Sequence, residues 1–395
     1  RHREVEEIFT QVLTLSQQVE ESPQLLPVLM GLSRFAMVRG EYQAAHDLAE
    51  RFTRIAAGLE DAASLLPAHF VLGYSAFRVG RFAAARQHLE RGIALHEQSQ
   101  NQLKPLDSLL YRLAANGQDP RIGCHSWLAW ILWHLGYPDQ ALTYSTQAIT
   151  LSQDLMLSTS EASAQYFAAA VHRSRRDSHA VLNCAERVLT IATDREAPYW
   201  LASGTFLRGW ALAEDGQWEP GIAEMKKGIA GWRALGNDHL GQPLLLLAEV
   251  CSKAGRANEG FRLLSSVVPL IAQSAERWWE AERYRIEGEL ILRAHDVGME
   301  TEAESCFRQA LVVAQKQQAK SLELRAAISL ARLWIGQGKT AEAQQMLTEI
   351  YSWFTEGFET GDLQDARALL QEMSAVSDQL SAVSTPPNLG HQYPT

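Results

Sequence analysis

The sequence has few cysteines, and none of them forms a paired motif. The four cysteines are far apart in the chain: Cys124, Cys184, Cys251 and Cys306. Zinc-binding and redox-active cysteines usually occur as pairs separated by two residues, and no such pair is present. The spacing therefore favours buried free thiols in a reducing cytoplasm, and we predict a cytoplasmic protein.

Long hydrophobic runs and an excess of basic residues are also missing. Charged residues or glycines interrupt the apolar residues every few positions, so we expect neither a transmembrane span nor a signal peptide. The formal net charge is −10, whereas a nucleic-acid-binding face needs clustered lysines and arginines. Nucleic acid and membrane are therefore not expected as partners. The chain starts with Arg1 inside a predicted helix, as a fragment of a longer polypeptide or a processed chain would.

Motifs for catalysis, metal binding and cofactor binding are missing as well. Residues 336–340, GQGKT, look like part of a phosphate-binding loop, but the first glycine that such a loop needs is replaced by Leu333. These residues are instead predicted to form a turn before a helix that starts at Thr340. The twelve histidines form no zinc-binding pattern, and His125 and His134 are too far apart to share an ion. We therefore predict no catalytic, metal-binding or cofactor-binding residue, and no cofactor.

The chain does contain turn signals, which recur about every forty residues. They lie at Gly40, Gly80, Gly136, Arg176, Gly216, Gly255, Gly298 and Gly338. A small residue precedes each turn within a predicted helix: Ser33, Gly73, Ala129, Ala169, Gly209, Ala248, Gly288 and Ala331. A second small or compact residue follows most of these: Ala45, Ala85, Ala141, Val181, Gly221, Gly260 and Ala343. In the seventh copy this second residue, Ala303, comes later than in the others, which predicts a short insertion in its turn.

Apolar residues on both sides of each turn recur three and four positions apart, as on the buried face of a helix. In the second copy Leu72 and Phe77 precede the turn at Gly80, and Leu89 and Ile93 follow it. A helix pair of this kind cannot bury its apolar face alone, so the copies must stack. We therefore predict an all-α fold: a right-handed α-solenoid of about eight helix pairs similar to tetratricopeptide repeats, with a C-terminal capping helix.

These elements divide the chain into five predicted segments. They are an N-terminal helix with the first two repeats (1–98), an insertion loop or short helix (99–121), six further repeats (122–358), a capping helix (359–383) and a flexible tail (384–395). Asparagine, glycine, proline and serine mark the insertion as loop-forming. A long insertion in a solenoid is often functional, and a tolerated surface loop is an equally good explanation.

In arrays of this kind the first helix of each pair lines the concave groove, so residues about one helical turn from its small position are candidates for partner binding. In the N-terminal half they are mainly aromatic, with some arginines: Arg34, Phe70, Tyr74, Phe77, Arg78, Ser126, Trp130, Trp133, His134, Tyr166, Arg173, Phe206 and Trp210. In the C-terminal half they are charged: Glu249, Arg285, Glu289 and Arg332. Packing between adjacent helix pairs is the alternative role for any one of the rings.

Several strings are distinctive when taken together. They are GQDP (117–120), LGYPDQAL (135–142), RGWALAEDGQ (208–217), ERWWEAE (276–282), AKSLELRAAISLARLW (319–334) and WFTEGFET (353–360). With them the chain resembles, over nearly its whole length, the C-terminal helical-repeat region of bacterial signalling proteins. Those proteins join a class III adenylate/guanylate cyclase-type or other effector module to a STAND-type AAA ATPase. The resemblance implies a sensor region whose ATPase and cyclase modules lie outside these residues.

Three functions follow, in order of preference. The first is a non-catalytic array that binds a peptide or protein partner in its groove and regulates the attached ATPase or effector domains. The second is a structural scaffold or oligomerisation module, in which outer faces hold copies or neighbouring modules together. The least favoured is an enzyme within these residues, because no acid/base pair or nucleophile motif is present.

Overall fold

A computed structural model describes residues 11–16, 18, 21–58, 62–99, 119–237, 240–273, 276–294 and 298–383. The described residues form helices and turns and no β-strand, which confirms the all-α prediction. Residues 100–118 of the predicted insertion and the whole predicted tail, 384–395, lie outside the described residues, as do residues 1–10. None of the described helices has both the length and the apolar character that a membrane span requires.

Eight helix pairs are present in the described part of the chain. They are α2 (Leu26–Val38) with α3 (Tyr42–Ala57), α4 (Ala62–Arg78) with α5 (Phe82–Ser99), α7 (Pro120–His134) with α8 (Pro138–Asp154), α9 (Ser158–Ser174) with α10 (Ser178–Asp194), α11 (Pro198–Glu214) with α12 (Trp218–Ala234), α13 (Gly241–Lys253) with α14 (Ala257–Gln273), α15 (Glu280–Arg293) with α16 (Glu300–Lys316), and α17 (Lys320–Gly336) with α18 (Thr340–Tyr351). A short 3-10 helix, η1 (Pro23–Leu25), precedes the first pair, and α19 (Gly361–Val383) follows the last. The repeat count predicted from the turn signals is therefore confirmed.

The chain reverses within each pair at a residue with a positive φ angle. Gly40 has φ 75°, and all eight predicted turn positions share this left-handed conformation. Glycine adopts it without the steric cost that a Cβ brings, whereas Arg176, with φ 65°, does not have that freedom. Residues 337–339 form such a turn between α17 and α18, and α18 begins at Thr340 as predicted. In the seventh pair α15 ends at Arg293 and α16 begins at Glu300, so six residues separate the two helices instead of the three found in the other pairs, which confirms the predicted insertion.

Small residues let the two helices of a pair approach closely, and α11 and α12 show this most clearly. A Cβ added to Gly209 would lie 2.7 Å from the carbonyl oxygen of Gly221, and one added to Gly221 would lie 2.7 Å from the carbonyl oxygen of Gly209. A larger side chain at either position would push the two backbones apart. The equivalent small residues of other pairs are fully buried: Ala45, Ala85, Ala141, Val181 and Ala343.

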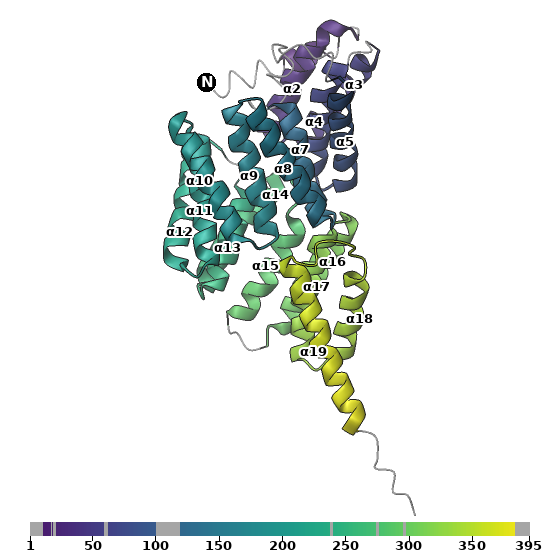
Figure 1. Ribbon diagram of the computed structural model, residues 1–395, viewed down its shortest axis with the longest axis vertical. Helices are drawn as coiled ribbons and strands as arrows, with labels where there is room; N and C mark the ends of the chain where they lie inside the picture. Colours follow the sequence, from purple (N-terminus) through teal and green to yellow (C-terminus); the bar gives the residue numbers. More distant parts are fainter. Residues whose placement is uncertain are drawn as a thin grey trace, which may run out of the picture.

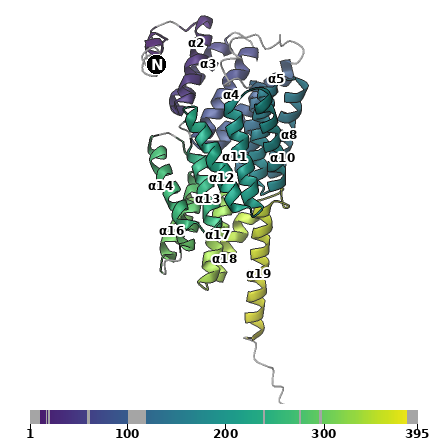
Figure 2. The same ribbon diagram turned by 90° about the vertical axis from the view of Figure 1, so that its left-hand side faces the viewer.

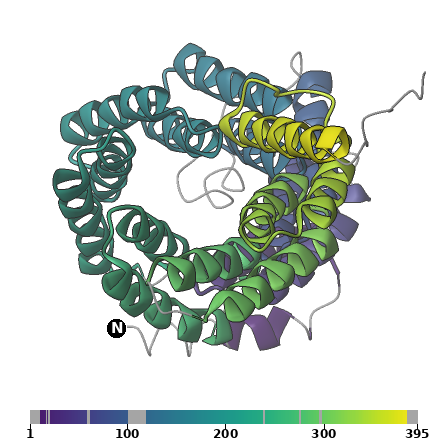
Figure 3. The ribbon, with the colours of Figure 1, turned by 90° about the horizontal axis from the view of Figure 1, so that it is seen from below.

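The pairs wind into a superhelix that closes on itself. Figure 1 shows α2–α5 at one end of the molecule and α17–α19 at the other, and Figure 2 shows the same order from the side. From below, the helices run around a central opening (Figure 3). The hydroxyl of Ser321 in α17 donates to the carbonyl oxygen of Trp133 in α7 at 2.5 Å, and the Gly357 N–H donates to Asp139 of α8 at 2.8 Å. Helices near the C-terminus thus rest on helices of the N-terminal half.

A second closing contact joins α3 and α4 to the segment before α15. The Tyr42 hydroxyl donates to the Glu276 carboxylate at 2.7 Å, and Arg78 donates to the Tyr42 oxygen at 2.8 Å and pairs with Glu276. Although burial alone would lower the pKa of Arg78, Glu276 raises it well above the usual range. The Trp279 indole N–H also donates to Glu276, at 3.0 Å. Because the Glu276 carboxylate is buried and paired with Arg78, which is itself only 12% exposed, the contact holds the superhelix in one arrangement.

The four cysteines are free, and Cys124, Cys184 and Cys251 are buried whereas Cys306 is half-buried. Burial raises the pKa of the Cys184 and Cys251 thiols to about 11, so both are protonated at neutral pH. The prediction of buried free thiols is therefore confirmed for three of the four.

Candidate ligand-binding lumen

The first helices of six consecutive pairs surround a cavity at the centre of the superhelix, which we call the lumen. Its wall comes from α7, α9, α11, α13, α15 and α17, and α19 adds residues at one end. The lumen comprises about 1320 Å³ of space between atoms, part of it continuous with solvent. One part of the wall is aromatic: Trp130, Trp133, Trp210, Trp278 and Trp279. The other part is charged and includes Arg173, Arg176, Glu249, Glu282, Arg285, Arg325, Asp362 and Asp365.

The aromatic wall is held in place by ring contacts. Trp130 and Trp278 meet edge to face, with ring centroids 4.7 Å apart. Phe77 lies behind them, with its centroid 5.3 Å from Trp130 and 5.0 Å from Trp278. Trp130 and Trp210 are each 4% exposed, so only a small part of either ring is accessible. Fixed rings of this kind offer an apolar surface that loses little conformational entropy when a ligand binds.

Arg285 holds two carboxylates in the charged wall. Its guanidinium donates to Glu249 of α13 at 2.6 Å and to Glu282 of α15 at 2.9 Å. Although burial alone would raise the pKa of Glu249, Arg285 and Lys253 hold it well below its usual range. Burial alone would also raise the pKa of Glu282, but Arg285 and Arg325 lower it. Both carboxylates are therefore ionised at neutral pH and neutralised by neighbouring cations.

Arg325 of α17 connects three elements at one end of the lumen. Its guanidinium donates to Asp362 of α19 at 2.7 Å, to the carbonyl oxygen of Ser174 in α9 at 2.8 Å, and to Glu282 at 3.5 Å. It also lies over the Trp133 ring, with Cζ 4.7 Å from the ring centroid. Although burial alone would lower the pKa of Arg325, Asp362 and Glu282 raise it. Arg325 therefore fixes α19 against α9.

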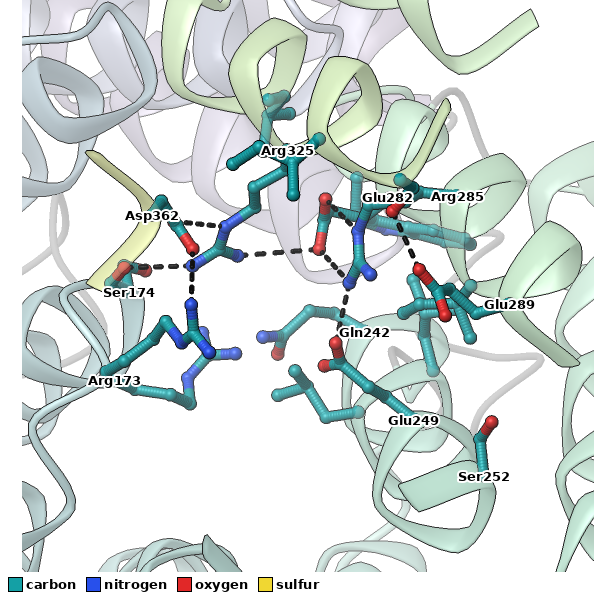
Figure 4. A pocket seen from close by; sticks show the side chains of 18 of the residues that line it. Arg173, Ser174, Gln242, Glu249, Ser252, Glu282, Arg285, Glu289, Arg325 and Asp362 are labelled. Carbon is teal, nitrogen blue, oxygen red and sulfur yellow. Dashed lines mark hydrogen bonds and ion pairs between the residues drawn. The ribbon is translucent and has the colours of Figure 1, made fainter. Parts of the chain in front are cut away.

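Arg173 of α9 differs from the other arginines of the wall. Figure 4 shows its side chain and that of Gln242 from α13 reaching into the lumen. Neither side chain makes a hydrogen bond or an ion pair with any residue in the described part of the chain. Burial lowers the pKa of Arg173 to about 10, Tyr166 acts in the opposite direction, and Arg325 lowers it further. The lumen thus holds an arginine that no carboxylate neutralises by direct contact.

Nine of the seventeen predicted groove residues line the lumen: Trp130, Trp133, His134, Arg173, Trp210, Glu249, Arg285, Glu289 and Arg332. Eight do not: Arg34, Phe70, Tyr74, Phe77, Arg78, Ser126, Tyr166 and Phe206. Within this second set, Phe70, Phe77, Ser126 and Phe206 are at most 4% exposed, because neighbouring helices cover the side of the helix that carries them. Arg78 is instead engaged by Glu276. Partner binding at any of the seventeen remains a prediction.

Sequence reasoning missed several residues of the charged wall. Glu282 and Arg325 each lie nearly two helical turns before the small residues of their helices, Gly288 and Ala331, beyond the single turn used to select candidates. Asp362 belongs to α19, which was predicted only as a cap. The lumen is deeper than one helical turn because the superhelix closes on itself. A window of two turns on each first helix would have included Glu282 and Arg325.

Comparison with known proteins supports the repeat assignment. The family model of the tetratricopeptide repeat matches residues 66–91, 122–143 and 324–348. These segments fall on α4 with α5, on α7 with α8, and on α17 with α18. No curated protein is significantly similar to the chain in sequence.

Among solved structures, the chain is similar to a Rap protein complexed with competence and sporulation factor, at 12% identity and a TM-score of 0.53, covering 96% of this chain and 94% of that one. It is also similar to the apo form of the quorum sensor NprR from B. thuringiensis, at 13% identity and a TM-score of 0.50, covering 89% and 93%. At these identities the likeness shows a shared fold and no more.

A third similar structure is the Signal Transduction ATPase with Numerous Domains (STAND) protein with a tetratricopeptide repeat sensor from Pyrococcus horikoshii. The identity is 14% and the TM-score 0.40, and the match covers 95% of this chain and 54% of that one. A TM-score of 0.40 is too low to indicate a shared overall arrangement of the repeats. The family model and the similar Rap and NprR structures together establish tetratricopeptide repeats in an α-solenoid fold.

Proposed function

We propose that the chain is a sensor without catalytic activity of its own, which binds a peptide or protein partner and thereby regulates an ATPase or effector module joined to it. The observation that carries this proposal is the lumen, which combines fixed aromatic rings with ordered ion pairs. Such a mixed surface is typical of recognition sites, where rings provide apolar contact and charged groups fix orientation. The similar Rap protein structure is a complex with competence and sporulation factor, which supports a bound partner for this fold.

The regulatory step would depend on the closed superhelix. A ligand in the lumen touches helices from both halves of the chain, because the wall includes α7 and α9 as well as α17 and α19. A ligand shifts a conformational equilibrium only as far as it binds one state more tightly than the other. A ligand that contacts both halves binds the closed arrangement more tightly than an open one. The attached module would respond to that shift.

The proposal is tested by filling the lumen. Leu246 of α13 is half-buried and lines the lumen, so Leu246→Trp would place an indole where a ligand would lie. The matched control is Val312→Trp on α16, where the side chain is 56% exposed and lies outside the lumen. Both variants are incubated with a library of short random peptides, and the peptides that co-elute with the protein are identified by mass spectrometry. We expect retention by wild type and V312W, and at least about tenfold less by L246W.

Equal retention by all three proteins would contradict binding in the lumen. Light scattering on the same samples distinguishes peptide binding from the scaffold alternative. If the protein forms an oligomer that L246W does not change, and no peptide is retained, a structural role is favoured. In a longer polypeptide that includes an ATPase, a retained peptide should change the rate of nucleotide hydrolysis, and L246W should remove that response.

A further inference from the structure

Ion pairing in the lumen is nearly complete. Arg285 is paired with Glu249 and Glu282, Arg325 with Asp362, and Arg332 with Asp365. The remaining charged side chains of the wall are also paired, including Arg176 with Asp365, Lys253 with Glu214 and Arg293 with Glu289. Each of these cations has a carboxylate within contact distance, so none of them is free to receive an anion without losing its present partner.

Arg173 is the exception within the described part of the chain. It projects from α9 into the same cavity, yet no carboxylate reaches it. Counting the charged residues of the wall, the cations exceed the carboxylates by one, and Arg173 is the cation left over. Arg173 is half-buried, and a cation that loses part of its water without gaining a carboxylate partner destabilises a protein, because nothing replaces the lost solvation. Such a residue is expected at a binding site, where strain is tolerated for function.

Gln242 supplies a second unpartnered polar group in the same space. Its carboxamide extends from α13 toward Arg173 across the lumen (Figure 4). A planar carboxylate accepts parallel hydrogen bonds from a guanidinium, and a carboxamide N–H adds a further donor. Trp133 and Trp210 line the same cavity and supply apolar surface to it. The arrangement suits a ligand with an apolar or aromatic body and an anionic end.

We propose that Arg173, assisted by Gln242, receives a carboxylate group of the ligand that occupies the lumen. This inference rests on the proposed function and names the group by which the ligand is recognised. A monoanion neutralises the single excess charge of the wall. A dianionic phosphate would leave the lumen, with its six carboxylates, carrying a net negative charge. The C-terminus of a short peptide and an acidic side chain share the required chemistry, as does a small aromatic acid.

The test compares Arg173→Gln with wild type and with Arg233→Gln, which makes the same chemical change at an exposed position of α12. Four probes are used: a random pentapeptide pool with free C-termini, the same pool with amidated C-termini, phenylacetate and phenyl phosphate. Loss of a charge-assisted hydrogen-bond pair should weaken binding by about tenfold to a hundredfold in R173Q and leave R233Q unchanged. The melting temperature of R173Q without ligand should equal or exceed that of wild type, because a half-buried charge without a carboxylate partner is removed.

The outcomes separate this inference from the proposed function. If wild type binds peptides with free C-termini more tightly than amidated ones, and R173Q does not, the bound group is a C-terminal carboxylate. If wild type binds both pools equally and the bound peptides are enriched in Asp or Glu, the bound group is a side-chain carboxylate. Peptide binding that R173Q does not change overturns the inference and leaves the proposed function standing. Arg173-dependent binding of phenylacetate without any peptide binding supports the carboxylate and overturns the peptide partner. Tighter binding of phenyl phosphate than of phenylacetate, or a lower melting temperature of R173Q, overturns the inference.

Discussion

His134 shows how the closed superhelix controls the charge of one residue. It lies at the end of α7 and is 3% exposed, with the Phe82 ring centroid 4.9 Å and the Trp278 centroid 5.9 Å from its own. Its Nδ1 donates to the carbonyl oxygen of Trp130 at 2.8 Å, so the neutral ring carries its proton there. Burial lowers the pKa of His134 to about 4, and the hydrogen bond to Trp130 opposes this only in part. The imidazole is therefore neutral at the centre of the fold.

This ionisation makes the stability of the protein depend on pH. Because the pKa of His134 is lower in the folded chain than in the unfolded one, the unfolded state binds the proton more tightly. The stability that the neutral ring contributes is present above about pH 6.5 and is lost as the pH falls toward about 4. Between pH 7 and pH 5, the free energy of unfolding of wild type should fall by about 2 kcal/mol more than that of His134→Asn.

Urea unfolding at the two pH values measures this difference. Asparagine keeps a donor near the position of Nδ1 and removes the titrating ring. His179→Asn, at an exposed position of α10, is the matched control and should follow wild type. An equal fall in wild type and H134N would show that His134 does not carry this part of the acid sensitivity.

At the scale of the helices, close packing within a pair depends on its small residues. In α11, a Cβ on Gly209 would lie 2.6 Å from the backbone nitrogen of Met225 and 2.7 Å from the carbonyl oxygen of Gly221. Backbone atoms cannot move aside as the end of a side chain can. Gly209→Ala should therefore lower the free energy of unfolding by about 1–3 kcal/mol, although alanine favours the helix itself.

Gly31→Ala provides the matched control for this prediction. Gly31 lies inside α2, and a Cβ there would meet no atom within 4 Å. Replacing it should raise the free energy of unfolding by about 0.5–1 kcal/mol, because only the backbone entropy of glycine is removed. Thermal unfolding monitored by circular dichroism measures both variants. If G209A were as stable as wild type, the close approach of α11 and α12 would not be needed.

Most of the helices could be predicted from the sequence, because the residues that mark their positions lie within a single repeat. Turn residues such as Gly80 and small residues such as Gly73 lie within one repeat and mark its helices directly. The charged wall could not be predicted in the same way, since Arg325 meets Asp362 and Ser174 only after the superhelix has closed. For the same reason Phe77 was expected in the groove, whereas the Trp278 ring from a distant repeat covers it. Contacts between repeats far apart in the chain are set by the pitch of the superhelix, which one repeat does not reveal.

At the scale of the whole molecule, the contacts that close the superhelix and the residues that line the lumen lie partly on the same helices. The contacts of Glu276 with Tyr42 and Arg78, and that of Ser321 with Trp133, hold the two halves of the chain together around the lumen. The helices that make these contacts include α7 and α17, which also form the wall. A ligand in the lumen and the closing contacts should therefore stabilise one another. This coupling would let a binding event inside the superhelix reach a module attached outside it.

Hydrogen exchange of the protein with and without a peptide retained from the random library tests this claim most directly. If the ligand occupies the lumen and favours closure, amide exchange should slow in α9, α13, α15 and α17, which form the wall, and remain unchanged in the outer helices α10, α12 and α16. Slowing confined to those outer helices, with the lumen helices unchanged, would contradict the account.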